Sequence, residues 1–225
     1  MTERKAQVSR KTTETQIELS VNLDGTGKSE VSVGVGFLDH MLGLLAKHGL
    51  FDLVVQATGD VQVDAHHTVE DVGICLGEAI KKALGDKKGI TRFGQACVPM
   101  DEALAQVVVD ISGRGHCECR MDVVHGLSYL RGALQTTIES VTKKDVTLEH
   151  AVDELMEHSD ERELLEEFAR ALAVNAGITL HINVPYGKNA HHVVEAVFKA
   201  LGRALREAVQ VDPRQKGLPS TKGVL

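Results

Sequence analysis

Two copies of a His-His-x-x-Glu pattern stand 125 residues apart in this chain, and both consist of side chains that can bind metal ions. The first copy occupies residues 66–70 and the second occupies residues 191–195. Aligned without a gap, residues 66–84 match residues 191–209 at nine of nineteen positions. The two halves of the chain therefore descend from one duplicated unit.

Each copy opens a segment in which apolar residues recur with the spacing of an amphipathic helix. Residues three or four apart share a helix face, so His66 or His67 can hold one ion together with Glu70. Adjacent histidines project about 100° apart, so one ion can hardly be bound by both. The repeated pair predicts two metal ions, each bound by both halves of the repeat.

Two further residues precede the copies at similar distances. His40 stands 26 residues before His66, and Glu167 stands 24 residues before His191, so the repeat predicts that each supplies a third ligand. Burying so many imidazoles and carboxylates without an ion would cost about 1–3 kcal/mol for each polar group left unsatisfied. A donor set rich in nitrogen, with carboxylates, suits Mn, Fe, Co, Ni or Zn, and the sequence does not rank them.

The elements that must position these residues begin with strands. Residues 15–23 alternate apolar and polar side chains, Asp24-Gly25 predicts a turn, and residues 31–35 form a second strand, which together indicate a β-hairpin. Residues 38–48 have a helical pattern. Residues 51–57 then predict a strand that leads towards the first His-His helix.

The second half repeats this order. Residues 103–112 predict a strand, Asp160 and Glu163 resemble a capping box for a helix that Gly177 ends, and residues 178–184 predict the next strand. The expected fold class is therefore α+β, with internally duplicated half-domains, each a mixed sheet with packed helices, joined as a pseudo-symmetric pair. A ferritin-like di-iron bundle also pairs Glu with His on helices, but the strands disfavour it.

We expect the first repeat to span residues 10–94, the second to span residues 95–209, and a C-terminal tail, residues 210–225, to contribute to the active site. Residues 122–159 match nothing in the first half, so we interpret them as a surface insertion with a short helix over residues 148–157. Three histidines in the insertion are expected to be solvated: His125, His150 and His158.

Composition excludes several classes of partner. The net charge of −7, the absence of a basic run and the seven aromatic residues argue against nucleic-acid binding. No stretch approaches the roughly 18 apolar residues of a membrane span, and residues 1–11 are charged, so we expect a cytoplasmic protein. The four cysteines lack Cys-x-x-Cys spacing and are expected to be reduced structural thiols.

Two glycine-containing segments imitate nucleotide-binding motifs. Residues 25–29 look like the end of a phosphate-binding loop, but Asn22 stands where that motif needs glycine, and residues 30–35 predict a strand instead of a helix. Residues 34–36 lack the third glycine of a dinucleotide fingerprint. We therefore do not expect a nucleotide site.

A series of motifs, taken in order, resembles the imidazoleglycerol-phosphate dehydratase family. The matching stretches include RKTTET at residues 10–15, GFLDHML at 36–42, HGLFDL at 48–53, residues 59–71 with GD at 59–60 and DAHHTVED at 64–71, PMDEA at 99–103, DISGR at 110–114, NAGITLH at 175–181, GKNAHH at 187–192 and residues 213–225. They cover the chain except its first few residues and residues 122–159. The resemblance implies a lyase that dehydrates imidazoleglycerol phosphate to imidazole acetol phosphate in histidine biosynthesis.

The resemblance also implies two Mn²⁺ ions per active site and a homo-oligomer of 24 subunits built from trimers, with each site between subunits. The implied metal ligands are His40, His66, His67, Glu70, Glu167, His191, His192 and Glu195. Glu167 departs from the many members that carry histidine there, although a carboxylate can still bind Mn²⁺. Leu44 stands where members often have a glutamine that contacts the substrate, so one polar contact is missing.

For the chemistry, Glu14 matches the family's catalytic glutamate and is expected to bind substrate and act as acid and base. Glu70 and Glu195 can also move protons while holding metal. The substrate phosphate is expected to meet a set of cations and hydroxyls, which consists of His48, Arg92, Arg114, Lys199, Ser220 and Lys222.

Two other functions fit paired metal clusters. A binuclear metallohydrolase acting on a phosphate ester would use a metal-bound water and release phosphate. A non-catalytic shell assembled by metal ions would bind the ions without turnover.

Overall fold

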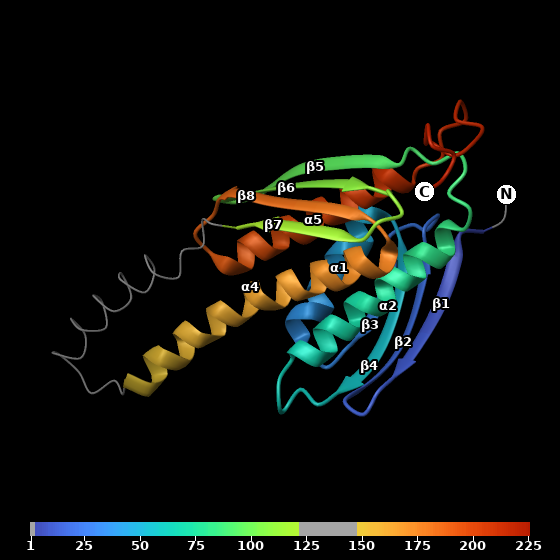
Figure 1. The fold of residues 1–225 in the computed structure, drawn as a ribbon. Helices are drawn as coiled ribbons and strands as arrows, with labels where there is room; N and C mark the ends of the chain where they lie inside the picture. Colours follow the sequence, from blue (N-terminus) through green and yellow to red (C-terminus); the bar gives the residue numbers. More distant parts are fainter. Residues whose placement is uncertain (1–2, 122–147) are drawn as a thin grey trace.

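Two four-stranded sheets enclose a layer of helices in the computed structural model, which describes residues 3–121 and 148–225, apart from the side chains of residues 148–161 (Figure 1). The strands are β1 (Lys5–Lys11), β2 (Thr15–Asn22), β3 (Ser29–Ser32), β4 (Asp52–Gly59), β5 (Phe93–Met100), β6 (Ala103–Asp110), β7 (His116–Arg120) and β8 (Thr179–Tyr186). The helices are α1 (Gly36–Gly49), α2 (His66–Leu84), α4 (Leu148–Ala176) and α5 (Ala190–Val209). Within these ranges, no helix is both long enough and apolar enough to cross a bilayer.

The two sheets have the same topology. Their strand orders are β1-β2-β4-β3 and β5-β6-β8-β7. In each sheet, the first three strands in this order run antiparallel, and the last strand pairs in parallel with its neighbour. This confirms the predicted α+β fold of two similar halves, each a mixed sheet with helices.

The predicted hairpin between residues 15–23 and 31–35 is wrong. β2 lies between β1 and β4, and β3 pairs with the far edge of β4. The turn after β2 is attached to the start of β4, because Asp52 Oδ1 accepts hydrogen bonds from the backbone N–H groups of Thr26 at 2.8 Å and Lys28 at 3.1 Å. A Cβ at Gly25 would collide with Asp52, so this close approach requires glycine.

The helix that precedes β8 is longer than expected. It begins at Leu148 and continues to Ala176, so Asp160 lies inside the helix and does not cap it. Residues 148–176 contain neither glycine nor proline, and therefore nothing in the sequence ends the helix between the two segments that were predicted separately. The rest of the expected insertion, residues 122–147, lies outside the described residues, as do His125 and the side chains of His150 and His158.

Each half packs one helix across its sheet, and two helix pairs join the halves. α2 packs on β1 and β2, α5 packs on β5 and β6, and the helices pair as α1 with α5 and α2 with α4. Figure 1 shows all four helices between the two sheets. The helices that carry the His-His pairs are thus each buried on one side by a sheet and on the other by a helix.

The helix pairs meet at equivalent glycines. A Cβ at Gly77 would lie 2.7 Å from the carbonyl oxygen of Leu172, and a Cβ at Gly202 would lie 2.6 Å from that of Leu45. Leu45 and Leu172 are therefore equivalent positions, 127 residues apart. His40 and Glu167, each five residues earlier, share that offset, which agrees with the alignment of the two halves.

Thr68 is a buried polar residue at a position where the second half has an apolar one. Its side chain is fully buried, and its hydroxyl has no hydrogen-bond partner among the described residues, whereas the equivalent residue of the second half is the buried Val193. We expect Thr68→Val to raise the free energy of unfolding by about 1 kcal/mol, because an unsatisfied buried hydroxyl is removed. Thermal or denaturant unfolding at a fixed subunit concentration measures the change. The reverse change, Val193→Thr, should be destabilising, and a less stable Thr68→Val variant would contradict the interpretation.

Candidate active site

A cluster of two histidines and one glutamate lies where α1 meets the first turns of α5. His40 Nε2 lies 3.0 Å and His191 Nε2 lies 3.2 Å from the same oxygen, Glu195 Oε1. The ring centroids of the two histidines are 6.1 Å apart, with planes 22° from parallel. Asn189 caps α5 by accepting a hydrogen bond from the backbone N–H of His191 at 2.9 Å, which fixes the start of the helix and thus the direction of its ligands.

Glu195 is ionised in this cluster. Burial alone would raise its pKa, but hydrogen bonds from Lys199 and His40 and the positive charge of Lys199 hold that pKa at about 2, and His191 adds a further hydrogen bond. The Lys199 ammonium donates to Glu195 Oε2, while Oε1 faces the two histidines. The carboxylate therefore presents a charged oxygen to the space between the imidazoles.

The donors of this cluster fit a divalent metal ion. One ligand atom from each of His40, His191 and Glu195 lies within 4.8 Å of the other two. Two imidazole nitrogens with one carboxylate oxygen are a set that first-row divalent ions bind. The structure thus supports a metal-binding role for these three residues.

The histidines of each His-His pair point in different directions. The ring planes of His66 and His67 are 88° apart, and those of His191 and His192 are 77° apart, with centroids 6.3 Å and 6.4 Å from each other. This confirms that adjacent histidines diverge at the start of a helix. A single ion in contact with both rings of a pair is therefore disfavoured.

The second histidine of each pair is held by a carboxylate from another part of its half. His67 Nδ1 lies 3.2 Å from both oxygens of Asp60, and His192 Nδ1 lies 2.7 Å from Glu102 Oε2. These hydrogen bonds raise the pKa of both histidines, and that with His192 is the main reason why the pKa of Glu102 falls to about 2. With Nδ1 engaged, Nε2 of each ring is left to bind an ion.

Sequence reasoning missed these two carboxylates. Asp60 follows β4, and Glu102 lies in the turn between β5 and β6, so neither stands at a ligand-like spacing from its histidine. Only the fold brings them together. Their one sequence signal was that both fall within motifs of the family resemblance, at residues 59–71 and 99–103.

Glu14 lies beside the first His-His pair. It belongs to the turn between β1 and β2, its side chain is 52% exposed, and its Oε2 lies 3.9 Å from His67 Nδ1. A carboxylate that is exposed and next to a predicted ligand can contact a bound molecule. The position is therefore suitable for an acid and base.

The remaining predicted ligands do not form a cluster of their own. Glu167 forms an ion pair with Arg170 at 3.2 Å, and His66 and Glu70 join no group of three close ligand atoms among the described residues. Of the eight predicted ligands, the structure thus gathers three into one group of close ligand atoms. The other five lie outside that group: His66, His67 and Glu70 on α2, Glu167 on α4, and His192 on α5.

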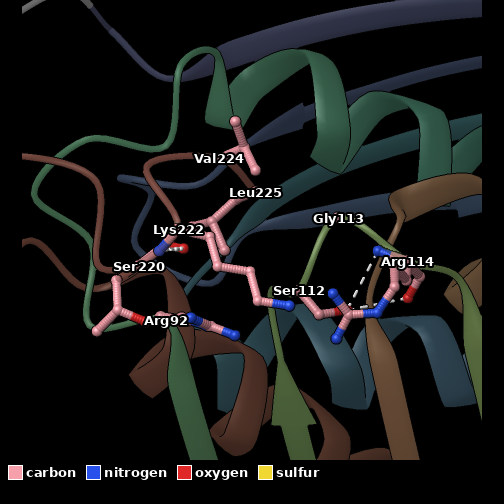
Figure 2. Close-up of a pocket in the computed structure, with 9 residues that line it drawn as sticks. Arg92, Ser112, Gly113, Arg114, Ser220, Lys222, Val224 and Leu225 are labelled. Atoms are coloured by element: carbon pink, nitrogen blue, oxygen red, sulfur yellow. Dashed lines mark hydrogen bonds between the residues drawn. The ribbon is translucent and has the colours of Figure 1, made fainter.

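Four of the predicted phosphate-binding residues line one pocket, which is shown in Figure 2. They are Arg92, Arg114, Ser220 and Lys222. Arg92 donates from Nε and Nη2 to Asp110 at 2.7 Å and 3.1 Å, and from Nη1 to the carbonyl oxygen of Pro219 at 2.8 Å. Arg92 thus binds the C-terminal tail to the end of β6, and the tail supplies part of the pocket wall.

The other two predicted phosphate contacts lie near the histidine cluster. His48 is in the last turn of α1, and burial lowers its pKa, as do the positive charges of Lys199 and Arg203 on α5. Lys199 donates to Glu195, and its Nζ also lies 3.1 Å from Met100 Sδ. Positive charge therefore gathers beside the cluster as well as in the tail pocket.

The histidine cluster and the tail pocket are far apart in one chain. His191 is in the first turn of α5, whereas the backbone N–H of Arg92 donates to the carbonyl oxygen of Ala208 near the other end of that helix. At a rise of about 1.5 Å per residue, the two places are about 25 Å apart. A small molecule with one ring and a short chain cannot contact both.

Comparison with known proteins gives one consistent family. The family model described as imidazoleglycerol-phosphate dehydratase matches residues 33–144 and 134–205. Proteins of that name are 55% identical over 225 residues in Clostridium botulinum (strain Langeland), with both chains covered completely, and 53% identical over 222 residues in Geobacillus kaustophilus, with 99% of each chain covered.

Solved structures agree with this result. A dehydratase structure from Staphylococcus aureus is 35% identical, with a TM-score of 0.69 over 92% of this chain and 99% of that chain. A structure from Pyrococcus furiosus, in complex with (S)-C348, is 36% identical, with a TM-score of 0.70 over 97% of this chain and 100% of that chain. The chain therefore belongs to the imidazoleglycerol-phosphate dehydratase family and is a hydro-lyase of histidine biosynthesis.

Proposed function

We propose that the chain dehydrates imidazoleglycerol phosphate at a site that holds two Mn²⁺ ions and is completed by residues of neighbouring subunits. The observation that carries this proposal is that His40, His191 and Glu195 converge on the helix pair α1 and α5. The other ligands of the first half and Glu167 are carried by the second helix pair, α2 and α4. A homo-oligomer of 24 subunits built from trimers would bring these two groups of ligands together. The roughly 25 Å along α5 between the histidine cluster and the tail pocket supports the same conclusion.

In the proposed site, His40, His191 and Glu195 hold metal from one side. The ligands from the neighbouring subunit are His66, His67, Glu70 and Glu167, and His192 completes the set. The divergence of each His-His pair supports two ions, because each pair then offers one ring to each ion. When bound, the two ions act as Lewis acids on the imidazole ring of the substrate, an effect worth several kcal/mol.

Glu14 is the residue proposed to remove the proton from the substrate carbon. The reaction also expels the neighbouring hydroxyl, and the two together leave as water. The carboxylate that takes the proton from carbon can therefore pass a proton to the expelled oxygen. The exposed position of Glu14, with its Oε2 3.9 Å from His67 Nδ1, supports this role. Glu70 and Glu195 remain further candidates for proton transfer, although the low pKa of Glu195 favours its role as a ligand.

The tail pocket is proposed to bind the phosphate. Arg114 and Lys222 offer charged donors, and Ser220 offers a hydroxyl, which together match the oxygens of a phosphate. Because Arg92 is already engaged by Asp110 and Pro219, its main part is to hold the tail in place. Lys199 and His48 supply donors from the side of the histidine cluster.

Anomalous scattering at the manganese edge tests the site as a whole. Crystals of the assembled protein, grown with Mn²⁺ and a substrate analogue, should show two peaks per site, with ligands from more than one subunit and with Glu167 among them. Data collected below the edge are the control for metal identity. A single peak, or two peaks whose protein ligands all come from one chain, would refute the proposed site.

A further inference from the structure

A buried polar network connects the turn that carries Glu14 to helix α2. Asp71, on α2, has 8% of its surface exposed, and its carboxylate accepts a hydrogen bond from Thr15 Oγ1 at 2.5 Å and another from Arg10 Nε at 2.8 Å. Thr15 is 4% exposed. The first residue of β2 is thus attached to α2 by side chains that water does not reach freely, where a hydrogen bond to a charged group is strong.

The same network fixes the backbone of Glu14. Thr12 Oγ1 accepts hydrogen bonds from the backbone N–H of Glu14 at 3.1 Å and from that of Thr15 at 2.9 Å, and it lies 3.1 Å from Thr15 Oγ1. The backbone N–H of Thr12 donates to the carbonyl oxygen of Thr15 at 2.9 Å. The turn is therefore closed on itself and joined to Asp71 through Thr15.

The second half of the chain shows that the fold does not need this network. The residue equivalent to Asp71 is Ala196, and the residue that opens β6, as Thr15 opens β2, is Ala103, and both alanines are buried. The environment is otherwise alike, because Gly59 approaches Thr15 as Gly187 approaches Ala103. An apolar pair is thus sufficient to dock a hairpin on its helix. The equivalent turn of the second half carries Glu102, which shares a hydrogen bond with His192 Nδ1 at 2.7 Å, whereas Glu14 Oε2 lies 3.9 Å from His67 Nδ1 and the polar pair occurs in its half.

We propose that Asp71, acting through Thr15, is a positioning residue that fixes Glu14 relative to the metal-binding turn of α2. The inference rests on the proposed role of Glu14. His66, His67 and Glu70 occupy the first turn of α2, so one rigid helix would determine both where the ring is bound and where the base stands. A reacting group that is displaced by about 1 Å can lose up to about 10²-fold in rate, which is the advantage of such an attachment.

The decisive variants are Thr15→Val and Thr15→Ser. Valine keeps the shape of threonine and removes the hydroxyl, so we expect kcat to fall roughly 10- to 100-fold, with KM, bound Mn²⁺ and sedimentation unchanged. Serine keeps the hydroxyl and should restore most of kcat. Thr68→Val is the matched control, because it removes a buried hydroxyl that has no partner among the described residues, and its kcat should stay at the wild-type value.

A second measurement does not depend on activity. Hydrogen exchange of the backbone amides of residues 14 and 15 should be faster in Thr15→Val than in the parent protein or in Thr15→Ser, because those amides donate to Thr12 Oγ1. Asp71→Asn, which keeps an acceptor and loses the charge, should give a smaller change in the same direction. This variant also serves if Thr15→Val does not fold.

The possible results distinguish the catalytic role of Glu14 from the positioning role of Thr15 and Asp71. If Glu14→Gln keeps full turnover, the assignment of Glu14 as acid and base is wrong, and the positioning role of Asp71 is then wrong as well. If Glu14→Gln loses turnover while Thr15→Val folds with unchanged kcat and unchanged exchange, only the positioning role is overturned. A Thr15→Val variant that loses kcat, bound Mn²⁺ and thermal stability together, without rescue by serine, would show a structural role and would also overturn it.

Discussion

Glu14→Gln will lower kcat by about 10²- to 10⁴-fold while the particle assembles and keeps its bound Mn²⁺. Glutamine has nearly the same shape as glutamate but cannot take a proton at neutral pH, so the step at the substrate carbon loses its base. The side chain is half exposed and its carboxylate serves no hydrogen bond in the described structure, so little stability should be lost. Steady-state formation of imidazole acetol phosphate measures the effect, with sedimentation and metal analysis performed on the same sample.

Glu18→Gln is the matched control for this substitution. Glu18 lies four residues further along, on an exposed position of β2, where it faces away from α2. The same loss of one negative charge should leave kcat unchanged there. Full turnover by an assembled Glu14→Gln variant would eliminate Glu14 as the acid and base.

Exhaustive chelation will abolish turnover and dissociate the particle into smaller oligomers. In the proposed site each ion is held by residues of more than one subunit, so removing the ions removes bonds between subunits as well as the Lewis acids. The ionised Glu195 would then face His40 and His191 without an ion between them, and a cluster that contributes binding energy to the interface would be lost. Sedimentation velocity before and after chelation measures the size of the particle.

The same chelator saturated with Mn²⁺ beforehand is the control for effects of the chelator itself. Adding Mn²⁺ back to the dissociated protein should restore both particle and turnover. Sedimentation that stays the same when metal analysis shows no bound ion would mean that the ions do not hold subunits together, and the shared site would have to be abandoned.

The duplication was predictable from the sequence because it is recorded in residue types. The matches between residues 66–84 and 191–209 fall on the buried faces of α2 and α5 and on their first turns, where packing and ligand geometry restrict substitution. Gly77 and Gly202 match because each lies against the backbone of a neighbouring helix. The fold class followed from this repeat and from the alternation of strands with helices.

Strand pairing was not predictable from local pattern. β1 was missed because Val8 is its one fully buried residue, so it lacks the alternation that marked β2. Without β1, the turn at Asp24-Gly25 was interpreted as a hairpin. The attachment of that turn to Asp52 depends on a residue 26 positions further along the chain, which no short sequence window contains.

In the site, too, local spacing predicted some contacts, and only the fold revealed the others. Spacing on a helix predicted that His191 and Glu195 share a face, and they do. The repeat predicted that His40 supplies a ligand, but only the pairing of α1 with α5 shows which copy of the pattern it joins. Asp60, Glu102 and the Asp71 network act across turns and between elements, so spacing along the chain gave no sign of their roles.

The length of α5 has a consequence for how this protein evolves. In the proposed oligomer, the histidine cluster and the tail pocket at opposite ends of that helix would serve different catalytic centres, so one substitution would alter parts of more than one centre. Natural selection would then act on the activity of the assembled particle and not on that of the single polypeptide. A protomer in isolation, however well folded, would carry fragments of several centres and the whole of none.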